Sequence, residues 1–102
     1  MKPTPIIDPP RTSRSNETVC LTNKFGLHLR AAAKLAQLAG RFNSDIQIRR
    51  GNQTVNAKSV LNMIALGVHE RRDLEIMAEG DDTEKAVGAI RELIKGKFGE
   101  LE

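Results

Sequence analysis

The sequence of 102 residues contains one cysteine, no tryptophan or tyrosine, and no long apolar run. Because Cys20 stands alone, the chain can form neither an internal disulfide nor a metal site built of cysteines, and we interpret it as a bystander thiol. No stretch approaches the roughly 20 apolar residues that span a bilayer, and the first residues lack the apolar segment of a secretory signal. These absences predict a soluble, cytoplasmic protein without membrane insertion.

The scarcity of aromatic residues also argues against nucleic acid as a partner. A net charge of +3 would suit a phosphate backbone. Proteins that bind single strands, however, need aromatic platforms on which bases stack, and the three phenylalanines do not cluster in the sequence. A basic face that meets an acidic protein partner explains the charge equally well. We therefore expect no nucleic acid partner and keep a small nucleic-acid module as the weakest alternative.

The length fits one domain preceded by a tail. Residues 1–16 hold all four prolines and few bulky aliphatic residues, which predicts a disordered tail. Residues 17–102 form the predicted domain, in which apolar residues alternate in some segments and recur at helical spacing in others. The pattern predicts a strand from residue 18, a helix over 30–41, a hairpin around 46–57, a short helix over 59–67, a strand around 74–78 and a final helix. This order indicates an α+β open-faced sandwich.

A histidine and an arginine lie two residues apart where the first helix is expected to begin. The first amides of a helix lack intrahelical acceptors and favour an anion, and Arg30 adds a charged fork for phosphate oxygens. The neutral imidazole of His28 is a nucleophile near neutral pH. Leu29, in the expected cap position, has no side-chain oxygen to occupy the amides. Spacing alone leaves open a surface or capping histidine, and His69 lacks this helix context.

The short helix carries a second group of candidates. Ser59 can cap its start, and Gly67 can end it. Val60, Leu61 and Ile64 cannot all point inward on so short a helix, which leaves them either as core residues or as an exposed apolar patch.

These two segments together resemble the HPr family of histidine-containing phosphocarriers, which serve the bacterial phosphoenolpyruvate-dependent phosphotransferase system. The resemblance rests on Gly26-Leu27-His28-Leu29-Arg30 and on Lys58-Ser59-Val60-Leu61-Asn62-Met63-Ile64-Ala65-Leu66-Gly67, and it covers residues 18–98. It implies a four-stranded antiparallel sheet with three helices on one face. The alanine-rich first helix fits the same family.

The resemblance also implies a reaction. Enzyme I would transfer a phosphoryl group to Nδ1 of His28, Arg30 would stabilise it, and an EIIA-type protein would receive it. The protein would then be a covalent carrier that depends on partner enzymes, without a cofactor or a metal and expected to be a monomer, rather than an enzyme. Val60, Leu61 and Ile64 match the docking patch of the family.

Ser59 matches the serine that HPr kinase/phosphorylase modifies in many members, and the alternative is that it only caps the helix. A second hypothesis for the whole chain is therefore a regulatory binding module that acts mainly through Ser59 phosphorylation and docking. The sequence departs from the family at Ala31, where members usually have proline, and in its Pro-rich tail. It does not distinguish a sugar-transport branch from a nitrogen-related one.

Overall fold

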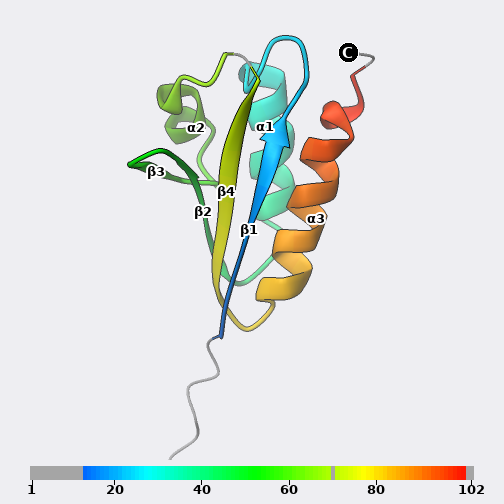
Figure 1. Cartoon of the computed structure of the whole chain (residues 1–102). Helices are drawn as coiled ribbons and strands as arrows, with labels where there is room; N and C mark the ends of the chain where they lie inside the picture. The colour runs from blue at the N-terminus through cyan, green and yellow to red at the C-terminus, as the bar shows by residue number, and fades with distance from the viewer. Residues whose placement is uncertain (1–12, 70, 101–102) are drawn as a thin grey trace, which may run out of the picture.

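The computed structural model describes residues 13–69 and 71–100, and in this part of the chain three helices pack against one face of a four-stranded antiparallel sheet (Figure 1). The elements follow the predicted order and end in a short 3-10 turn, η1. Their bounds are β1 Ser13–Leu21, α1 Leu29–Ala39, β2 Asp45–Arg50, β3 Gln53–Asn56, α2 Val60–Leu66, β4 Arg72–Gly80, α3 Thr83–Lys95 and η1 Lys97–Gly99. The predicted fold class is thereby confirmed.

The sheet has the strand order β1-β4-β2-β3, so the strand that is last in the sequence lies in the middle. β4 pairs with β1 from Ser13↔Gly80 to Leu21↔Arg72, and it pairs with β2 on its other side. β1 thus begins at Ser13, which places residues 13–16 in the sheet and not in the predicted tail. The rest of the predicted tail, residues 1–12, lies outside the described residues.

The core forms between the sheet and the helices because each strand alternates buried and exposed residues. Ile46 and Ile48 of β2 and Leu74 and Ile76 of β4 are almost fully buried on the face that the helices cover. On α1, Ala31, Ala32, Leu35 and Ala39 are fully buried, and small side chains at these positions let the helix approach the sheet closely. No helix in the described part of the chain is long and apolar enough to cross a membrane.

Asp82 occupies the N-cap position of α3, but its carboxylate makes no capping bond. It accepts hydrogen bonds from the hydroxyl of Ser44 at 2.5 Å and from the amides of Asn43 and Ser44 at 2.8 and 2.9 Å. The bond from the Ser44 hydroxyl and then that from the Asn43 amide hold the pKa of Asp82 below its ordinary value of 3.8. This carboxylate therefore ties the loop before β2 to the start of α3.

Acid is expected to weaken the fold through Asp82. A carboxyl whose pKa is lower in the folded chain stabilises the fold above its unfolded pKa of about 3.9, and this contribution is lost as the pH falls through the folded pKa. Asp82→Asn should therefore lower the urea midpoint of unfolding more near about pH 7 than near about pH 3. Asp81→Asn, at an exposed neighbour, is the control, and equal losses at both pH values for Asp82→Asn would contradict the assignment.

Candidate functional site

The loop between β1 and α1 fixes the position of His28. Gly26 has a φ of +67°, in the left-handed region that favours glycine. A Cβ at this position would lie 2.5 Å from the carbonyl oxygen of Val68, so the loop packs directly against the segment that follows α2. The amide of Leu27 donates to the same carbonyl oxygen at 2.8 Å. The backbone before the histidine is therefore held by the end of α2.

His28 is itself the N-cap of α1, with extended backbone angles, so the predicted cap at Leu29 is wrong. The reason is that Nδ1 of the imidazole accepts a hydrogen bond from the amide of Ala31 at 3.5 Å, as a capping oxygen would do. Fewer amides at the start of α1 are therefore free than the sequence predicted, because the amide of Ala31 already has an acceptor. Within the described residues the structure shows no acceptor for the amides of Leu29 and Arg30, and these remain available to an anion.

Arg30 lies in the first turn of α1, two residues after His28, and its side chain is exposed. Among the residues that the structure describes, no carboxylate forms an ion pair with it. Its guanidinium therefore adds a positive charge to a helix N-terminus that already carries the positive end of the helix dipole. The first turn of α1 contains no acidic residue, so the helix itself brings no negative charge that would oppose a phosphate-like group.

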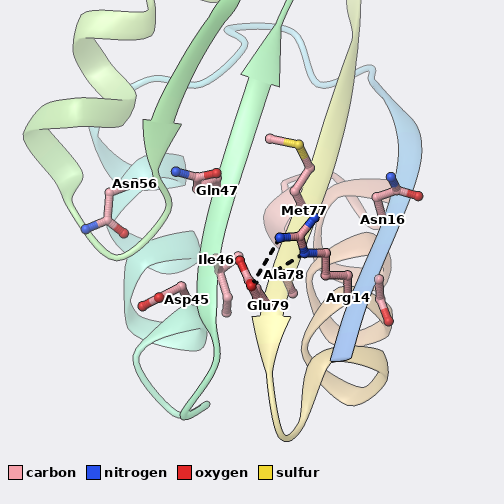
Figure 2. Close-up of a pocket in the computed structure, with 10 residues that line it drawn as sticks. Arg14, Asn16, Asp45, Ile46, Gln47, Asn56, Met77, Ala78 and Glu79 are labelled. Carbon is pink, nitrogen blue, oxygen red and sulfur yellow. Dashed lines mark hydrogen bonds and ion pairs between the residues drawn. The ribbon is translucent and has the colours of Figure 1, made fainter. Parts of the chain in front are cut away.

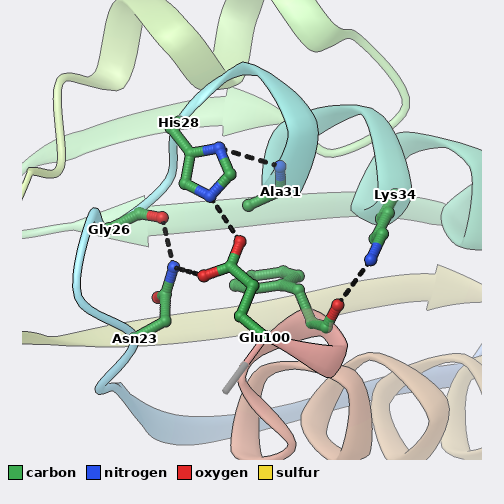
Figure 3. Close-up of polar contacts among 7 residues, drawn as sticks. Asn23, Gly26, His28, Ala31, Lys34 and Glu100 are labelled. Atoms are coloured by element: carbon green, nitrogen blue, oxygen red, sulfur yellow. Dashed lines mark hydrogen bonds and ion pairs between the residues drawn. The ribbon is translucent and has the colours of Figure 1, made fainter. Parts of the chain in front are cut away.

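Glu100 is a site residue that the sequence did not predict. Its Oε2 lies 2.5 Å from Nε2 of His28, and its Oε1 accepts from the side-chain amide of Asn23 at 3.0 Å (Figure 3). The same amide of Asn23 donates to the carbonyl oxygen of Gly26 at 2.7 Å. Burial by itself would raise the pKa of Glu100, but hydrogen bonds from Asn23 and His28 and the charges of His28 and Lys34 hold it below its ordinary value.

The predicted apolar patch on α2 is exposed only in part. The side chains of Leu61 and Ile64 are 79% and 39% exposed, whereas Val60 is half-buried and packs against the core. The structure adds two exposed apolar side chains close to the histidine, Leu29 at 65% and Phe25 at 63%. The ring of Phe25 meets the imidazole of His28 edge-on, with 6.3 Å between the ring centroids. We call Phe25, Leu29, Leu61 and Ile64 the apolar patch.

Ser59 caps α2 as predicted, because its Oγ accepts from the amide of Asn62 at 3.1 Å. It does not lie beside His28. The side chain of Lys58 donates to the carbonyl oxygen of Phe42, just beyond the C-terminal end of α1, whereas the other end of α2 meets the loop at Gly26. Ser59 and His28 therefore lie toward opposite ends of α2, a helix of seven residues that is about 10 Å long.

A separate shallow hollow lies on the open face of the sheet, away from these residues (Figure 2). It is lined by polar side chains such as Asn16, Gln47 and Asn56, and by an ion pair between Arg14 and Glu79. None of the predicted site residues contributes to it. In the described part of the chain, no group of three or more histidine, cysteine, aspartate and glutamate side chains is arranged to hold a metal ion.

Comparison with known proteins identifies the relatives of this chain. Residues 15–96 match the family model PTS-HPr, described as the PTS HPr component phosphorylation site. The phosphocarrier protein HPr of Cupriavidus necator is 39% identical over 82 residues, which are 80% of this chain and 92% of that protein. The phosphocarrier protein NPr of Shewanella violacea is 40% identical over 83 residues, 81% of this chain and 89% of that protein.

Solved structures of HPr proteins are also similar to this chain. A crystal structure of HPr from Thermoanaerobacter tengcongensis superposes with a TM-score of 0.83 at 42% sequence identity, covering 86% of this chain and 99% of that one. A crystal structure of HPr from Bacillus anthracis superposes with a TM-score of 0.77 at 34% identity, covering 80% and 98%.

Proposed function

Since the chain belongs to the PTS HPr family of phosphocarriers, we propose that phospho-Enzyme I transfers a phosphoryl group to Nδ1 of His28 and that an EIIA-type protein then receives it. The observation that carries this proposal is the position of His28. Its Nδ1 points at the N-terminal amides of α1, where a phosphoryl group would find hydrogen-bond donors. We further propose that the protein acts as a monomer in the cytoplasm, as a carrier without catalytic activity of its own.

The arrangement supports the chemistry in three ways. The lone pair of Nδ1 is accessible to phosphorus once the long bond from Ala31 is given up. The amides of Leu29 and Arg30, together with the freed amide of Ala31, can then donate to the phosphoryl oxygens. The exposed guanidinium of Arg30 can balance their charge. Phosphoryl transfer needs mainly positioning and charge stabilisation, so a site this small suffices when the partner supplies the rest.

The experiment that tests this function is a relay. The full chain is incubated with Enzyme I and phosphoenolpyruvate labelled in the phosphoryl group, and an EIIA protein is then added. We expect one acid-labile phosphoryl group on the chain and its transfer to EIIA. A wild-type chain that stays unlabelled would contradict the proposal.

Replacing Arg30 should slow the transfer without unfolding the protein. Arg30→Gln removes a charge that has no ion-pair partner in the described residues, so the free energy of unfolding should change by less than about 0.5 kcal/mol. A charge-assisted bond to phosphate is worth about 1.5–3 kcal/mol, so the rate of phosphorylation should fall about 10- to 100-fold. Arg41→Gln, at an exposed arginine beyond the other end of α1, is the matched control. Equal rates for the two variants would exclude a role for Arg30.

The apolar patch is the surface we propose for partner docking. Phe25 contacts the imidazole of His28, and the exposed cations Lys24 and Arg30 directly neighbour Phe25 and Leu29 in the chain, which suits a partner with an apolar centre and an acidic border. Val60, which was expected in this patch, contributes mainly to the core. We therefore assign docking to Leu61 and Ile64 from the sequence prediction and to Phe25 and Leu29 from the structure.

Leu61→Ser tests this surface. Because Leu61 is 79% exposed, the variant should keep the unfolding free energy within about 0.5 kcal/mol of the wild type. Loss of an apolar anchor of about 1–2 kcal/mol should raise the KM for phosphorylation by Enzyme I about 5- to 30-fold. Gln47→Ser, on the open face of the sheet, should leave the KM unchanged. A KM that rises equally in both variants would rule out a specific role for the patch.

A regulatory role for Ser59 is the second candidate. A phosphate at the N-cap of α2 would carry about −2 charge at a distance from His28 that is close to the Debye length, so it would act on a docked acidic partner more than on the histidine. Acid-stable phosphate on Ser59 after treatment with ATP and HPr kinase/phosphorylase, together with no labile phosphate on His28, would favour a purely regulatory module.

The relatives include both HPr and NPr proteins at nearly equal identity, so they do not select a sugar or a nitrogen branch.

A further inference from the structure

Phe25 is an aromatic residue at a position where the fold does not require one. It is one of the two central residues of the turn over 23–26 that joins β1 to α1, a place that turns usually fill with glycine, asparagine or aspartate. It is 63% exposed, and within the described residues it is not among those that pack against the core. Burial in the core therefore does not explain the ring.

The turn that carries Phe25 is nevertheless fixed. The amide of Gly26 donates to the carbonyl oxygen of Asn23 at 3.2 Å, and the side-chain amide of Asn23 donates to the carbonyl oxygen of Gly26 at 2.7 Å (Figure 3). Gly26 also lies against the backbone of Val68 and His69, with no room for a Cβ. The backbone thus sets the direction in which the side chain of Phe25 leaves the turn.

From this turn the ring of Phe25 reaches the imidazole of His28. The two ring planes meet at 82° and the ring centroids are 6.3 Å apart, which lies within the range that edge-to-face aromatic pairs prefer. Nζ of Lys24 lies 5.5 Å from the centroid of the Phe25 ring, close enough for a cation–π attraction. The ring is therefore in contact with both a cation and the reactive imidazole.

The imidazole needs support of this kind because its capping bond is long. The distance from the amide nitrogen of Ala31 to the imidazole of His28 is 3.5 Å, and the bond must be given up when phosphorus approaches. A contact between rings uses no lone pair, so it can persist throughout the transfer. Phosphoryl transfer depends on positioning, and a displacement of about 1 Å can slow a reaction by about 100-fold.

We propose that Phe25 is a positioning residue, whose ring holds the imidazole of His28 in the orientation from which it accepts the phosphoryl group. This inference rests on the proposed function and gives Phe25 a role beyond docking. A residue that only docks a partner changes the KM, whereas a residue that orients the imidazole changes the kcat and also acts in the free protein. The two roles therefore predict different measurements.

The first measurement is NMR of the full chain without a partner. The wild type should show nuclear Overhauser effects between the ring protons of Phe25 and those of His28, and three-bond couplings should show one dominant χ1 rotamer of His28. Phe25→Leu keeps an apolar side chain but removes the ring, so it should spread His28 over more than one rotamer. Phe25→Tyr keeps the ring and should keep the wild-type pattern, because its added hydroxyl can remain in water at this exposed position.

The second measurement is phosphorylation by Enzyme I at saturating phosphoenolpyruvate, with the full chain as the varied substrate. Phe25→Leu should lower the kcat about two- to tenfold, as expected for the loss of one aromatic pair, and should keep the KM within about twofold of the wild type. Phe25→Tyr should match the wild type in both constants. Leu61→Ser, at an exposed apolar residue of α2, is the control and should change the KM alone.

An unchanged kcat or an unchanged rotamer distribution in Phe25→Leu would overturn the inference, and so would a change confined to the KM. Because Phe25 lies outside the core, Phe25→Leu should fold as the wild type does. A wild-type chain that accepts no phosphoryl group would overturn the proposed function instead. The NMR measurement, made without any partner, then still decides whether Phe25 orients the imidazole, so the two failures are distinguishable.

Discussion

His28→Ala is expected to abolish phosphoryl acceptance. The variant lacks the only nucleophile at the N-terminus of α1, and neither Arg30 nor the backbone amides can form a bond to phosphorus. Its fold should survive. Loss of the capping bond to Ala31 costs about 1 kcal/mol, and the histidine is not part of the apolar core. The check is label transfer from phosphoenolpyruvate through Enzyme I, with circular dichroism to confirm folding.

His69→Ala is the matched control for this variant, since it removes the second histidine of the chain from an exposed loop position. It should accept as much acid-labile phosphate as the wild type. Acid-labile label that persists in His28→Ala and disappears in His69→Ala would move the site to the other histidine and contradict the assignment.

Gly26→Ala is expected to disturb the site through the backbone. The left-handed φ of +67° costs a residue with a side chain about 1–2 kcal/mol, and the new Cβ would lie 2.5 Å from the carbonyl oxygen of Val68. The loop must move away from the end of α2, and His28 moves with it. We expect a loss of unfolding free energy of at least about 2 kcal/mol and a phosphorylation rate reduced about tenfold or more.

Gly51→Ala separates the cost of the left-handed backbone angle from the cost of the clash with Val68. Gly51 has a similar φ of +60°, but a Cβ there would meet nothing within 4 Å. This control should show only the conformational cost in a urea titration, with phosphorylation unchanged. If both variants lose the same unfolding free energy and are phosphorylated equally well, the close approach of Gly26 to Val68 does not contribute to phosphorylation.

The cap of α1 shows both what the sequence could predict and where it failed. The position of a helix start near His28 followed from the alanine-rich pattern and was confirmed to within one residue. The identity of the cap was wrong because capping preferences concern short polar side chains, whereas here an imidazole nitrogen does the same work through its own geometry. The histidine therefore caps the helix, and this role is compatible with the proposed phosphoryl acceptance, which the sequence suggested only as its alternative.

Glu100 could not have been predicted from spacing along the chain. It lies 72 residues after His28, and its approach depends on a turn in which Lys97 and Phe98 adopt backbone angles that no sequence rule assigns to lysine or phenylalanine. A weak signal existed in Gly96, which ends α3, and in Gly99, which ends the turn. That signal indicates a change of direction, but it does not show where the turn leads.

The docking patch could be predicted from the sequence only in part. The sequence predicted that Val60, Leu61 and Ile64 could not all be buried, and the structure exposes Leu61 and Ile64 but packs Val60 against the core. Periodicity fixes the relative directions of side chains on a helix, while the neighbouring elements decide which direction is covered. The contributions of Phe25 and Leu29 were missed because a loop residue and the first residue of a helix carry no periodic signal.

The proposed function depends on a bond between phosphorus and Nδ1 of His28. The most direct test is ³¹P and ¹⁵N NMR of the full chain, labelled with ¹⁵N and phosphorylated by Enzyme I with phosphoenolpyruvate. We expect one phosphorus resonance coupled to Nδ1 of His28, with the proton on Nε2. Phosphorus coupled to Nε2, or bound to another side chain, would contradict it.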